Sequence, residues 1–169
     1  MKMEVPSWDD YFMTMAYLVA SKSKDKRTHI GAVVVGPNKE IRSTGYNSFV
    51  RNLNDSAPNR QQRPEKYFWF EHAERNAIYN ATLMGVSLKD CVMYTNGIPC
   101  MDCARGIVQS KILEVIVDKT WDSGSSERWR ENSKRTLEMF KETGVALRYH
   151  KPNFIDIKKF NDGKIFSLK

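Results

Sequence analysis

Residues 71–103 read EHAERNAIYNATLMGVSLKDCVMYTNGIPCMDC, and this stretch decides how the chain can fold and act. It carries His72, Glu74, Cys100 and Cys103. One imidazole and two cysteines three apart can supply three ligands to a zinc ion, and catalytic zinc sites keep a fourth position for water. A further cysteine or histidine at ligand spacing would indicate a closed structural site, and the stretch offers none.

The two cysteines stand at a predicted helix start directly after Pro99, so both sulfurs face one side of the helix. Amides at a helix N-terminus favour the thiolate form. A bound ion would lower the pKa of its water from ~15.7 toward ~7, and Glu74 is close enough to His72 to move protons there. The combined pattern H-x-E and P-C-x-x-C therefore predicts one catalytic zinc ion per subunit. Its ligands are His72, Cys100 and Cys103, and Glu74 is the catalytic residue.

Hydrophobic periodicity and turn residues predict alternating helices and strands along the rest of the chain. The predicted helices cover residues 8–23, 71–84, 100–110 and about 125–143, the last starting at Ser125 or Ser126. The predicted strands cover residues 30–36, 40–46, 91–95, 113–117 and 145–149. Residues 47–65 are polar and without period, which predicts a long loop of the kind that is usually functional or disordered. A hairpin around Asn161-Asp162-Gly163 is predicted for the tail.

This order of elements predicts an α/β fold in three α/β/α layers. The first two strands pair antiparallel as a hairpin, so the central five-stranded sheet is mixed, and a hairpin-like tail follows it. The whole chain, residues 1–169, is predicted to be one domain with a core at about 7–149 and a C-terminal extension at 150–169. A chain of this size buries roughly 70% of its unfolded surface and needs no disulfides.

Composition narrows the classes of function. Three cysteines, two of them at metal-ligand spacing, suit a metal in a reducing compartment better than a disulfide framework. No apolar run approaches the ~20 residues that span a bilayer, and the N-terminal residues show no signal-peptide core, so a cytoplasmic protein without a membrane partner is expected. The formal net charge of +7 favours anionic ligands, which are nucleic acid, a membrane surface or a phosphorylated metabolite.

On the His72-Ala-Glu74 and Pro99-Cys100-x-x-Cys103 motifs, the sequence resembles the cytidine/deoxycytidylate deaminase superfamily, and within it the deoxycytidylate (dCMP) deaminases. The resemblance covers about residues 7–149 and implies a cytidine-deaminase-like fold. Three weaker pieces agree with it in order and spacing: Ser23-Lys-Asp25 followed by Thr28-x-Ile30-Gly31-Ala32, Gly45-Tyr-Asn47, and Asp118-Lys-x-x-Asp122-Ser123.

The resemblance implies zinc-dependent hydrolytic deamination of dCMP to dUMP and ammonia, a step of pyrimidine deoxynucleotide metabolism. Glu74 would take a proton from the zinc-bound water and deliver it to N3 of the ring. Hydroxide would attack C4, and Glu74 would then protonate the departing ammonia. The family pattern also implies that Asn47 holds the sugar hydroxyl, that the Ala73 backbone contacts the base, and that Gly31 and Ala32 pass close to the ring.

A nucleotide also requires a phosphate site and a surface for its base. Lys24 and Arg27 are best placed by the family pattern to bind phosphate, which arginine binds bidentately and lysine as a point charge. Trp121 is a candidate to stack on the base, and core or interface packing is the alternative for it. Further basic candidates for the phosphate, with solvated surface as the alternative, are Arg51, Arg60 and Arg63.

Two alternative functions stay open. The first is a related deaminase that acts on another nucleotide, a nucleoside or adenosine in tRNA; tRNA enzymes usually place glutamate before the Pro-Cys pair, where Ile98 stands. The second is a non-catalytic zinc or nucleic-acid-binding domain, which has no use for Glu74. The family resemblance implies a homo-oligomer, a hexamer or a dimer, while a nucleic-acid partner is not expected.

Overall fold

The structure is a computed structural model, and it describes residues 5–121, 127–161 and 164–167. A five-stranded sheet with strand order β2-β1-β5-β6-β7 forms its centre. Its strands are β1 (Gly31–Val35), β2 (Ile41–Tyr46), β5 (Val92–Thr95), β6 (Glu114–Asp118) and β7 (Ala146–His150). β1 pairs antiparallel with β2 and β5, whereas β5, β6 and β7 run parallel. The prediction of a mixed five-stranded sheet is confirmed.

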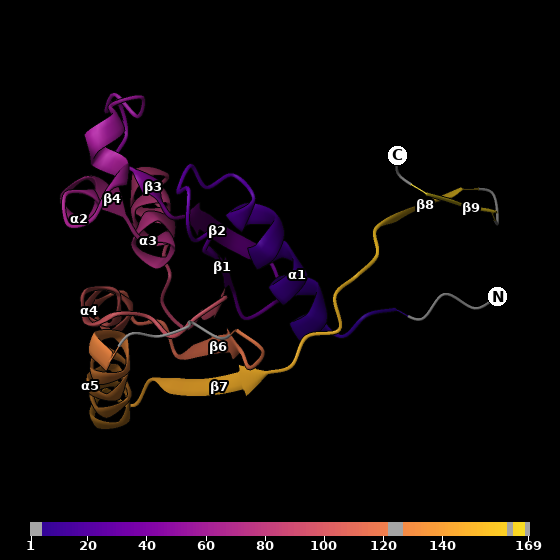
Figure 1. The fold of residues 1–169 in the computed structure, drawn as a ribbon. Coiled ribbons are helices and arrows are strands. Elements are labelled where there is room, and N and C mark those ends of the chain that lie inside the picture. The colour runs from indigo at the N-terminus through magenta and orange to yellow at the C-terminus, as the bar shows by residue number, and fades with distance from the viewer. Residues whose placement is uncertain (1–4, 122–126, 162–163, 168–169) are drawn as a thin grey trace.

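Helices cover both faces of this sheet (Figure 1). α1 (Trp8–Ala20) packs on one face, and α3 (Ala73–Leu83), α4 (Met101–Gln109) and α5 (Glu127–Thr143) lie on the other. Successive strand residues point to opposite faces, so Val33 faces the α1 side while Ala32 and Val34 face the α3 side. The chain therefore builds the three layers that the alternation of helices and strands predicts.

Helix starts in the site region differ slightly from the predicted ones. The helix expected from Glu71 begins at Ala73, because Phe70–Glu71 forms a short strand, β4, and His72 adopts an extended backbone as the N-cap. Cys100 is the N-cap of α4 in the same way. The proposed start of the last helix at Ser125 or Ser126 lies outside the described residues. As a result, two of the three predicted metal ligands, His72 and Cys100, lie at helix N-termini.

Residues 47–65 are mostly loop and turn, as predicted, but they also contain short ordered elements that the sequence did not predict. Residues 48–49 form strand β3 (Ser48–Phe49), which pairs antiparallel with β4, so that residues 50–69 make an excursion closed at its base. The excursion contains a 3₁₀ turn, η1 (Pro58–Gln61), and a short helix, α2 (Lys66–Trp69). Phe49 and Phe70 stack at the base with ring centroids 4.2 Å apart. Polar composition hid this order because much of it comes from tertiary contacts, which local periodicity does not report.

The tail first packs on α1 and then leaves the body of the molecule (Figure 1). The Phe154 ring meets the edge of Tyr17 at 4.8 Å, and the Ile155 amide donates to Thr14 Oγ1. Strands β8 (Lys158–Asn161) and β9 (Lys164–Ser167) then pair antiparallel as the predicted hairpin. The turn expected at Asp162-Gly163 lies outside the described residues.

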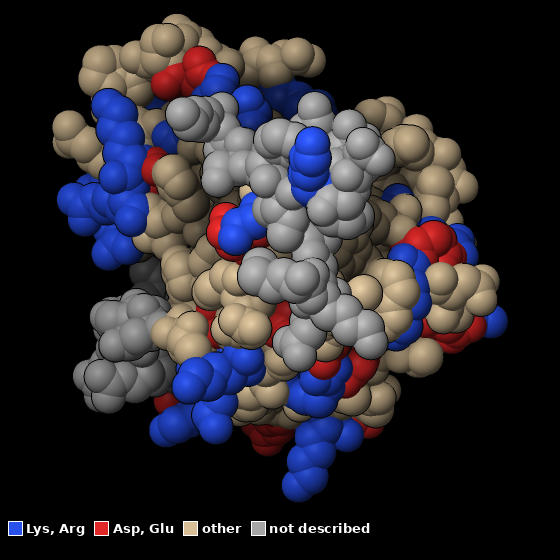
Figure 2. Space-filling model, turned by 90° about the vertical axis from the view of Figure 1, so that its right-hand side faces the viewer, with Lys and Arg blue, Asp and Glu red and all other residues tan. Residues whose placement is uncertain are grey.

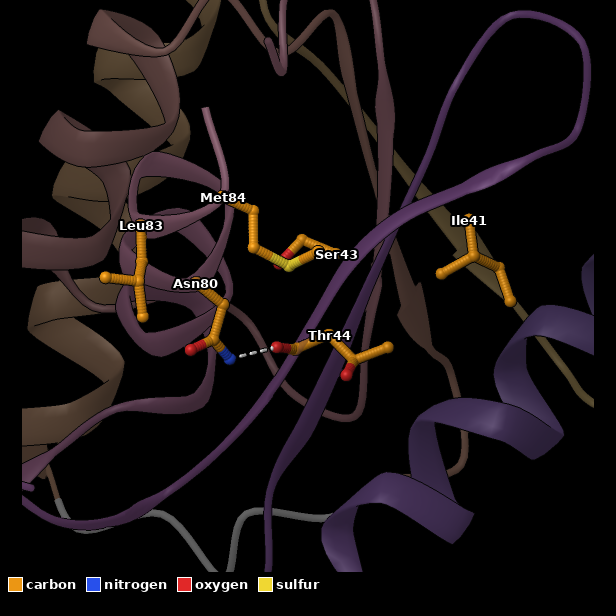
Figure 3. A pocket seen from close by; sticks show the side chains of 6 residues that line it. All are labelled: Ile41, Ser43, Thr44, Asn80, Leu83 and Met84. Carbon is orange, nitrogen blue, oxygen red and sulfur yellow. Dashed lines mark hydrogen bonds between the residues drawn. The ribbon is translucent and has the colours of Figure 1, made fainter. Parts of the chain in front are cut away.

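α3 approaches β2 unusually closely, and this approach positions the start of α3. A Cβ on Gly45 would collide with the backbone oxygen of Ala73 and the backbone nitrogen of Ala77. Asn76 Nδ2 donates to the Tyr46 carbonyl at 2.8 Å, and Asn80 Nδ2 donates to the Thr44 carbonyl at 2.6 Å (Figure 3). Glycine is therefore required at position 45 for the helix to lie against the strand.

The far end of α3 borders a hollow of about 270 Å³ beside β2 (Figure 3). Its lining includes Ile41, Leu83 and Met84, whose side chains are exposed. Because α3 has 11 residues, this hollow lies about 16 Å along the helix from His72. The hollow is thus separate from the predicted metal site.

We predict that Gly45→Ala lowers the free energy of unfolding by about 2 kcal/mol, because the new methyl collides with backbone that cannot move without displacing α3. Urea denaturation followed by circular dichroism measures this change. Gly106→Ala is the control: its methyl would lie 3.2 Å from the movable Ile78 Cδ1, and alanine favours the helix by about 0.5–1 kcal/mol. Equal midpoints for Gly45→Ala and the unchanged protein would contradict the close-approach argument.

Candidate active site

The N-termini of α3 and α4 bring three potential metal ligands together. His72 and Cys100 are the N-caps of these helices, and Cys103 follows one turn into α4. Among the described residues, His72, Cys100 and Cys103 form a group whose ligand atoms all lie within 4.8 Å of one another. Both helices start on the same face of the sheet, so the distance of 28 residues in sequence closes to a few ångströms.

The distances within this group match the edges of a zinc tetrahedron. His72 Nδ1 lies 3.4 Å from Cys100 Sγ and 3.6 Å from Cys103 Sγ, and the two sulfurs are 3.5 Å apart. Zinc bonds of about 2.3 Å to sulfur and 2.0 Å to nitrogen would set tetrahedral edges of about 3.6–3.8 Å. The donor set and its spacing therefore fit zinc, with one tetrahedral position left open by the protein.

Glu74 lies beside this group, in the first turn of α3. Its side chain is buried, and its Oε2 lies 3.6 Å from Cys103 Sγ. Burial raises the pKa of the Glu74 carboxyl above its ordinary value, because a low-dielectric surrounding disfavours the charged form. A carboxyl with a raised pKa can both accept and release a proton near neutral pH, as acid–base catalysis requires.

The two thiols titrate as a coupled pair. The hydrogen bond between the sulfurs, followed by the contact with His72, lowers the pKa of Cys100 to about 3. The same contact and burial raise the pKa of Cys103. The Cys100 thiol therefore loses its proton more easily than the Cys103 thiol. A bound cation would compensate the negative charge of a second thiolate.

Arg75 places a positive charge next to the cysteines. Its side chain is mostly buried and pairs with Glu71, while Nη1 lies 3.6 Å from Asp102 Oδ2. Burial alone would lower the pKa of Arg75, but the nearby Cys103 and Glu71 raise it, so the guanidinium stays charged. The charge offsets part of the negative potential that two thiolates and a carboxylate create.

The small residues expected beside the base lie at the start of the interior strand β1 and at the start of α3. Ala32 and Ala73 are fully buried in the core cluster on the α3 side. Gly31 begins β1, and its amide donates to Asn96 Oδ1 at 2.6 Å. A Cβ on Gly31 would collide with the Ala16 carbonyl of α1, so this glycine is required for packing whatever its relation to a ligand.

The Asn47 side chain is buried and held from three directions. Its Oδ1 accepts from the Ile30 amide at 2.8 Å. Its Nδ2 donates to Asp25 Oδ2 at 3.1 Å and to the Thr28 carbonyl at 2.9 Å. Both N–H donors are therefore used inside the protein, and one lone pair of Oδ1 remains to accept from a ligand hydroxyl.

The basic candidates for a phosphate site fall into two groups. Lys24 and Arg27 are exposed in the segment that precedes β1, and Lys24 pairs with Asp55 of the excursion. The others contact their own neighbours: Arg51 donates to Asn80, Arg60 lies 4.2 Å from the Trp69 ring, and Arg63 lies 5.7 Å from the Tyr67 ring. Lys24 therefore also has a partner of its own, whereas Arg27 is exposed, and the assignment of the phosphate site stays a prediction.

Trp121 lies against the loop that leads to Cys100. A Cβ on Gly97 would stand 3.1 Å from the indole, so the ring covers this glycine. The indole also meets Tyr17 at 6.3 Å between centroids. Trp121 is partly exposed, so part of its indole surface remains accessible beside the loop that leads to Cys100.

Two buried charges beside Asn47 escaped the sequence prediction. Asp25 and Lys66 pair with each other, at 4% and 8% exposure, although they stand 41 residues apart. A signal was present, since Asp25 is the one acidic residue in the basic run SKSKDKRTH at residues 21–29. Its partner could not be found from sequence, because the excursion folds back only in three dimensions.

Fold and site together define a class of protein: a mixed α/β scaffold with a His-Cys-Cys group suited to a metal ion and a buried carboxyl beside it. A family model described as the cytidine and deoxycytidylate deaminase zinc-binding region matches residues 6–119. The chain belongs to this family, and the prediction of a zinc cofactor is confirmed.

Curated relatives and solved structures agree with this family assignment. The deoxycytidylate deaminase of Mus musculus is 34% identical over 157 residues, covering 89% of this chain and 83% of that one. A probable deoxycytidylate deaminase of Drosophila melanogaster is 36% identical over 157 residues, covering 86% and 73%. The dCMP deaminase of cyanophage S-TIM5, crystallised with dCMP and dUMP, has 21% identity and a TM-score of 0.69 over 88% of this chain and 100% of that one. This structural likeness supports the fold.

The surface distribution of charge is mixed. Figure 2 shows Lys and Arg side chains in separate groups, with Asp and Glu between them, over the described part of one face. Within the described residues, the structure has no helix with the length and hydropathy to cross a membrane.

We predict that Cys103→Ser reduces bound zinc from about one ion per chain to about a tenth of that, because a serine hydroxyl replaces a buried thiolate ligand. Metal analysis of purified protein by mass spectrometry measures the ratio. Cys91→Ala is the control, since Cys91 is equally buried but lies outside the ligand group and should keep the full ion. Loss of zinc in both variants would contradict the assignment of Cys103 as a specific ligand.

Proposed function

We propose that the protein is a zinc-dependent hydrolase that deaminates dCMP to dUMP and ammonia. One observation carries this proposal: the buried Glu74 carboxyl lies 3.6 Å from Cys103 Sγ, beside a group that offers three metal ligands among the described residues. A structural zinc site would need a fourth ligand and no buried acid. Family membership and the deoxycytidylate deaminases among its relatives support the substrate.

The proposed mechanism assigns proton transfer to one side chain. His72, Cys100 and Cys103 would hold a zinc ion, which would supply Lewis-acid chemistry by lowering the pKa of a water toward ~7. Glu74 accepts the proton of the attacking water and passes it to N3 of cytosine, which makes C4 electrophilic. As the water oxygen bonds to C4, Glu74 carries the remaining proton of that oxygen to the amino group, and ammonia leaves as the C4–N bond breaks and the C4 carbonyl forms. One water is consumed and the products are dUMP and ammonia.

The proposed substrate contacts are those that the family resemblance implies. Asn47 can accept a hydrogen bond from a sugar hydroxyl, because one lone pair of its Oδ1 remains available. The Ala73 backbone, Gly31 and Ala32 would border the base, and Trp121 would stack on it. Exposed Lys24 and Arg27 would bind the phosphate, as lysine and arginine side chains do in other proteins.

Association between copies remains a prediction of this proposal. A homo-oligomer, either a hexamer or a dimer, and a cytoplasmic location are both expected from the family and the composition. The exposed Ile41, Leu83 and Met84 around the hollow in Figure 3 are consistent with a surface that is covered in an assembly. Light scattering of the purified protein determines the number of chains.

We predict that Glu74→Gln lowers kcat for dCMP by about 10²–10⁴-fold while the zinc content stays unchanged, because glutamine keeps the shape but cannot carry protons. Ammonia release and metal analysis give the two measurements. The control is Glu138→Gln, an exposed glutamate of α5, which should retain full activity. Full activity in Glu74→Gln would overturn the proposed mechanism.

Substrate identity is tested by a panel of dCMP, CMP, dCTP, deoxycytidine and a tRNA anticodon arm. We expect dCMP to have the highest kcat/KM, and deoxycytidine to fall about 10- to 100-fold below it, because the charged hydrogen bonds to phosphate are lost. The alternative of a related deaminase predicts turnover of another compound with intact Glu74 dependence. Tight binding of the RNA without turnover of any compound would favour the nucleic-acid-binding alternative.

A further inference from the structure

A buried carboxylate joins the segment before β1 to the excursion. Asp25 is 4% exposed and all of its acceptor positions are in use. Oδ1 accepts from the amides of Arg27 at 2.8 Å and Thr28 at 3.3 Å. Oδ2 accepts from Asn47 Nδ2 at 3.1 Å and forms the ion pair with Lys66. Asp25 therefore holds its own loop, the end of β2 and α2 of the excursion at one point.

Lys66 is the excursion's contribution to this point. It is the first residue of α2, it is 8% exposed, and its Nζ also lies 5.2 Å from the Phe70 ring centroid. A buried ammonium without its partner is strongly unfavourable, so the pair keeps α2 where Asp25 is. The remaining described links between the two segments are more exposed, and they include the Lys24–Asp55 ion pair.

Asp25 also contributes to the orientation of the Asn47 amide. Its Nδ2 must face the Asp25 carboxylate and the Thr28 carbonyl, while Oδ1 must face the Ile30 amide. A rotation of the amide by 180° would set its oxygen against a carboxylate and its N–H groups against an N–H donor. Asp25, together with the Thr28 carbonyl and the Ile30 amide, therefore leaves an acceptor, and not a donor, as the free group of Asn47.

We propose that Asp25 and Lys66 are positioning residues for nucleotide binding: their buried ion pair orients the Asn47 amide and holds the excursion against residues 23–30. This inference rests on the proposed function, because it supposes that Asn47 accepts from the sugar hydroxyl. It adds two residues whose described hydrogen bonds and ion pairs involve neither the potential metal ligands nor Glu74. Loss of the pair should therefore weaken binding of dCMP more than it slows the chemical step.

The first test compares Lys66→Met, which keeps the alkyl stem and removes the charge, with Lys66→Arg, which keeps the pair. We expect Lys66→Met to raise KM for dCMP about 10- to 100-fold with kcat changed less than about threefold, and Lys66→Arg to restore KM. Lys134→Met is the matched control, because Lys134 forms an exposed ion pair with Glu131 on α5. An unchanged KM in Lys66→Met overturns the proposal.

A second variant separates positioning from stability. Asp25→Asn alone leaves the Lys66 charge buried and should unfold easily, whereas Asp25→Asn combined with Lys66→Met buries no lone charge and should recover stability. The proposal predicts that the double variant keeps the high KM, because the Asn47 amide is no longer oriented by a carboxylate. Recovery of both stability and KM would show a merely structural pair and overturn the inference.

A third measurement does not depend on turnover. Amide hydrogen exchange followed by mass spectrometry should show about tenfold faster exchange across residues 58–66 in Lys66→Met, and unchanged exchange in Lys66→Arg and Lys134→Met. If the protein failed to deaminate dCMP, this result would still stand, so failure of the proposed function is distinguishable. Unchanged exchange in Lys66→Met would overturn the clamping of the excursion.

Discussion

The convergence of two helix N-termini is the constraint on which the structure depends. His72 and Cys100 must come within 3.4 Å, although each caps a different helix. α3 reaches its place because Gly45 lets the helix lie directly on β2, and because asparagine amides of α3 bind the strand carbonyls. α4 follows β5, the strand that pairs antiparallel with β1 on one side and parallel with β6 on the other. The sheet, Gly45 and the two helix N-caps together position the three potential metal ligands.

Electrostatics at this convergence explains why a buried acid is tolerated. The helix N-termini supply partial positive charge, and Arg75 adds a full one beside Cys103. These charges favour thiolates, while burial raises the pKa of the Glu74 carboxyl above its ordinary value. The same arrangement of charges therefore supports both tasks, holding a cation and moving protons. A non-catalytic zinc domain would need the first task alone.

The segments proposed to surround a nucleotide differ from the potential metal ligands in how their positions are encoded in the sequence. Residues 71–103 carry their chemistry in a local pattern, and spacing was enough to name His72, Glu74, Cys100 and Cys103. The excursion at residues 50–69 has no such pattern, and its order comes from β3–β4 pairing and from the buried Lys66. Sequence reasoning interpreted it as a loop because polar residues conceal a long-range ion pair. Local periodicity carries no information about a partner 41 residues away.

The sequence by itself determined the alternation of helices and strands, the mixed sheet and the metal chemistry. It could do so because hydrophobic period, turn residues and ligand spacing are local properties. Tertiary structure alone decided that Asp25 meets Lys66, that Asn47 presents an acceptor, and that Gly45 and Gly31 are packing requirements. These features depend on which surfaces the folded chain brings into contact, and burial then gives the paired charges their strength.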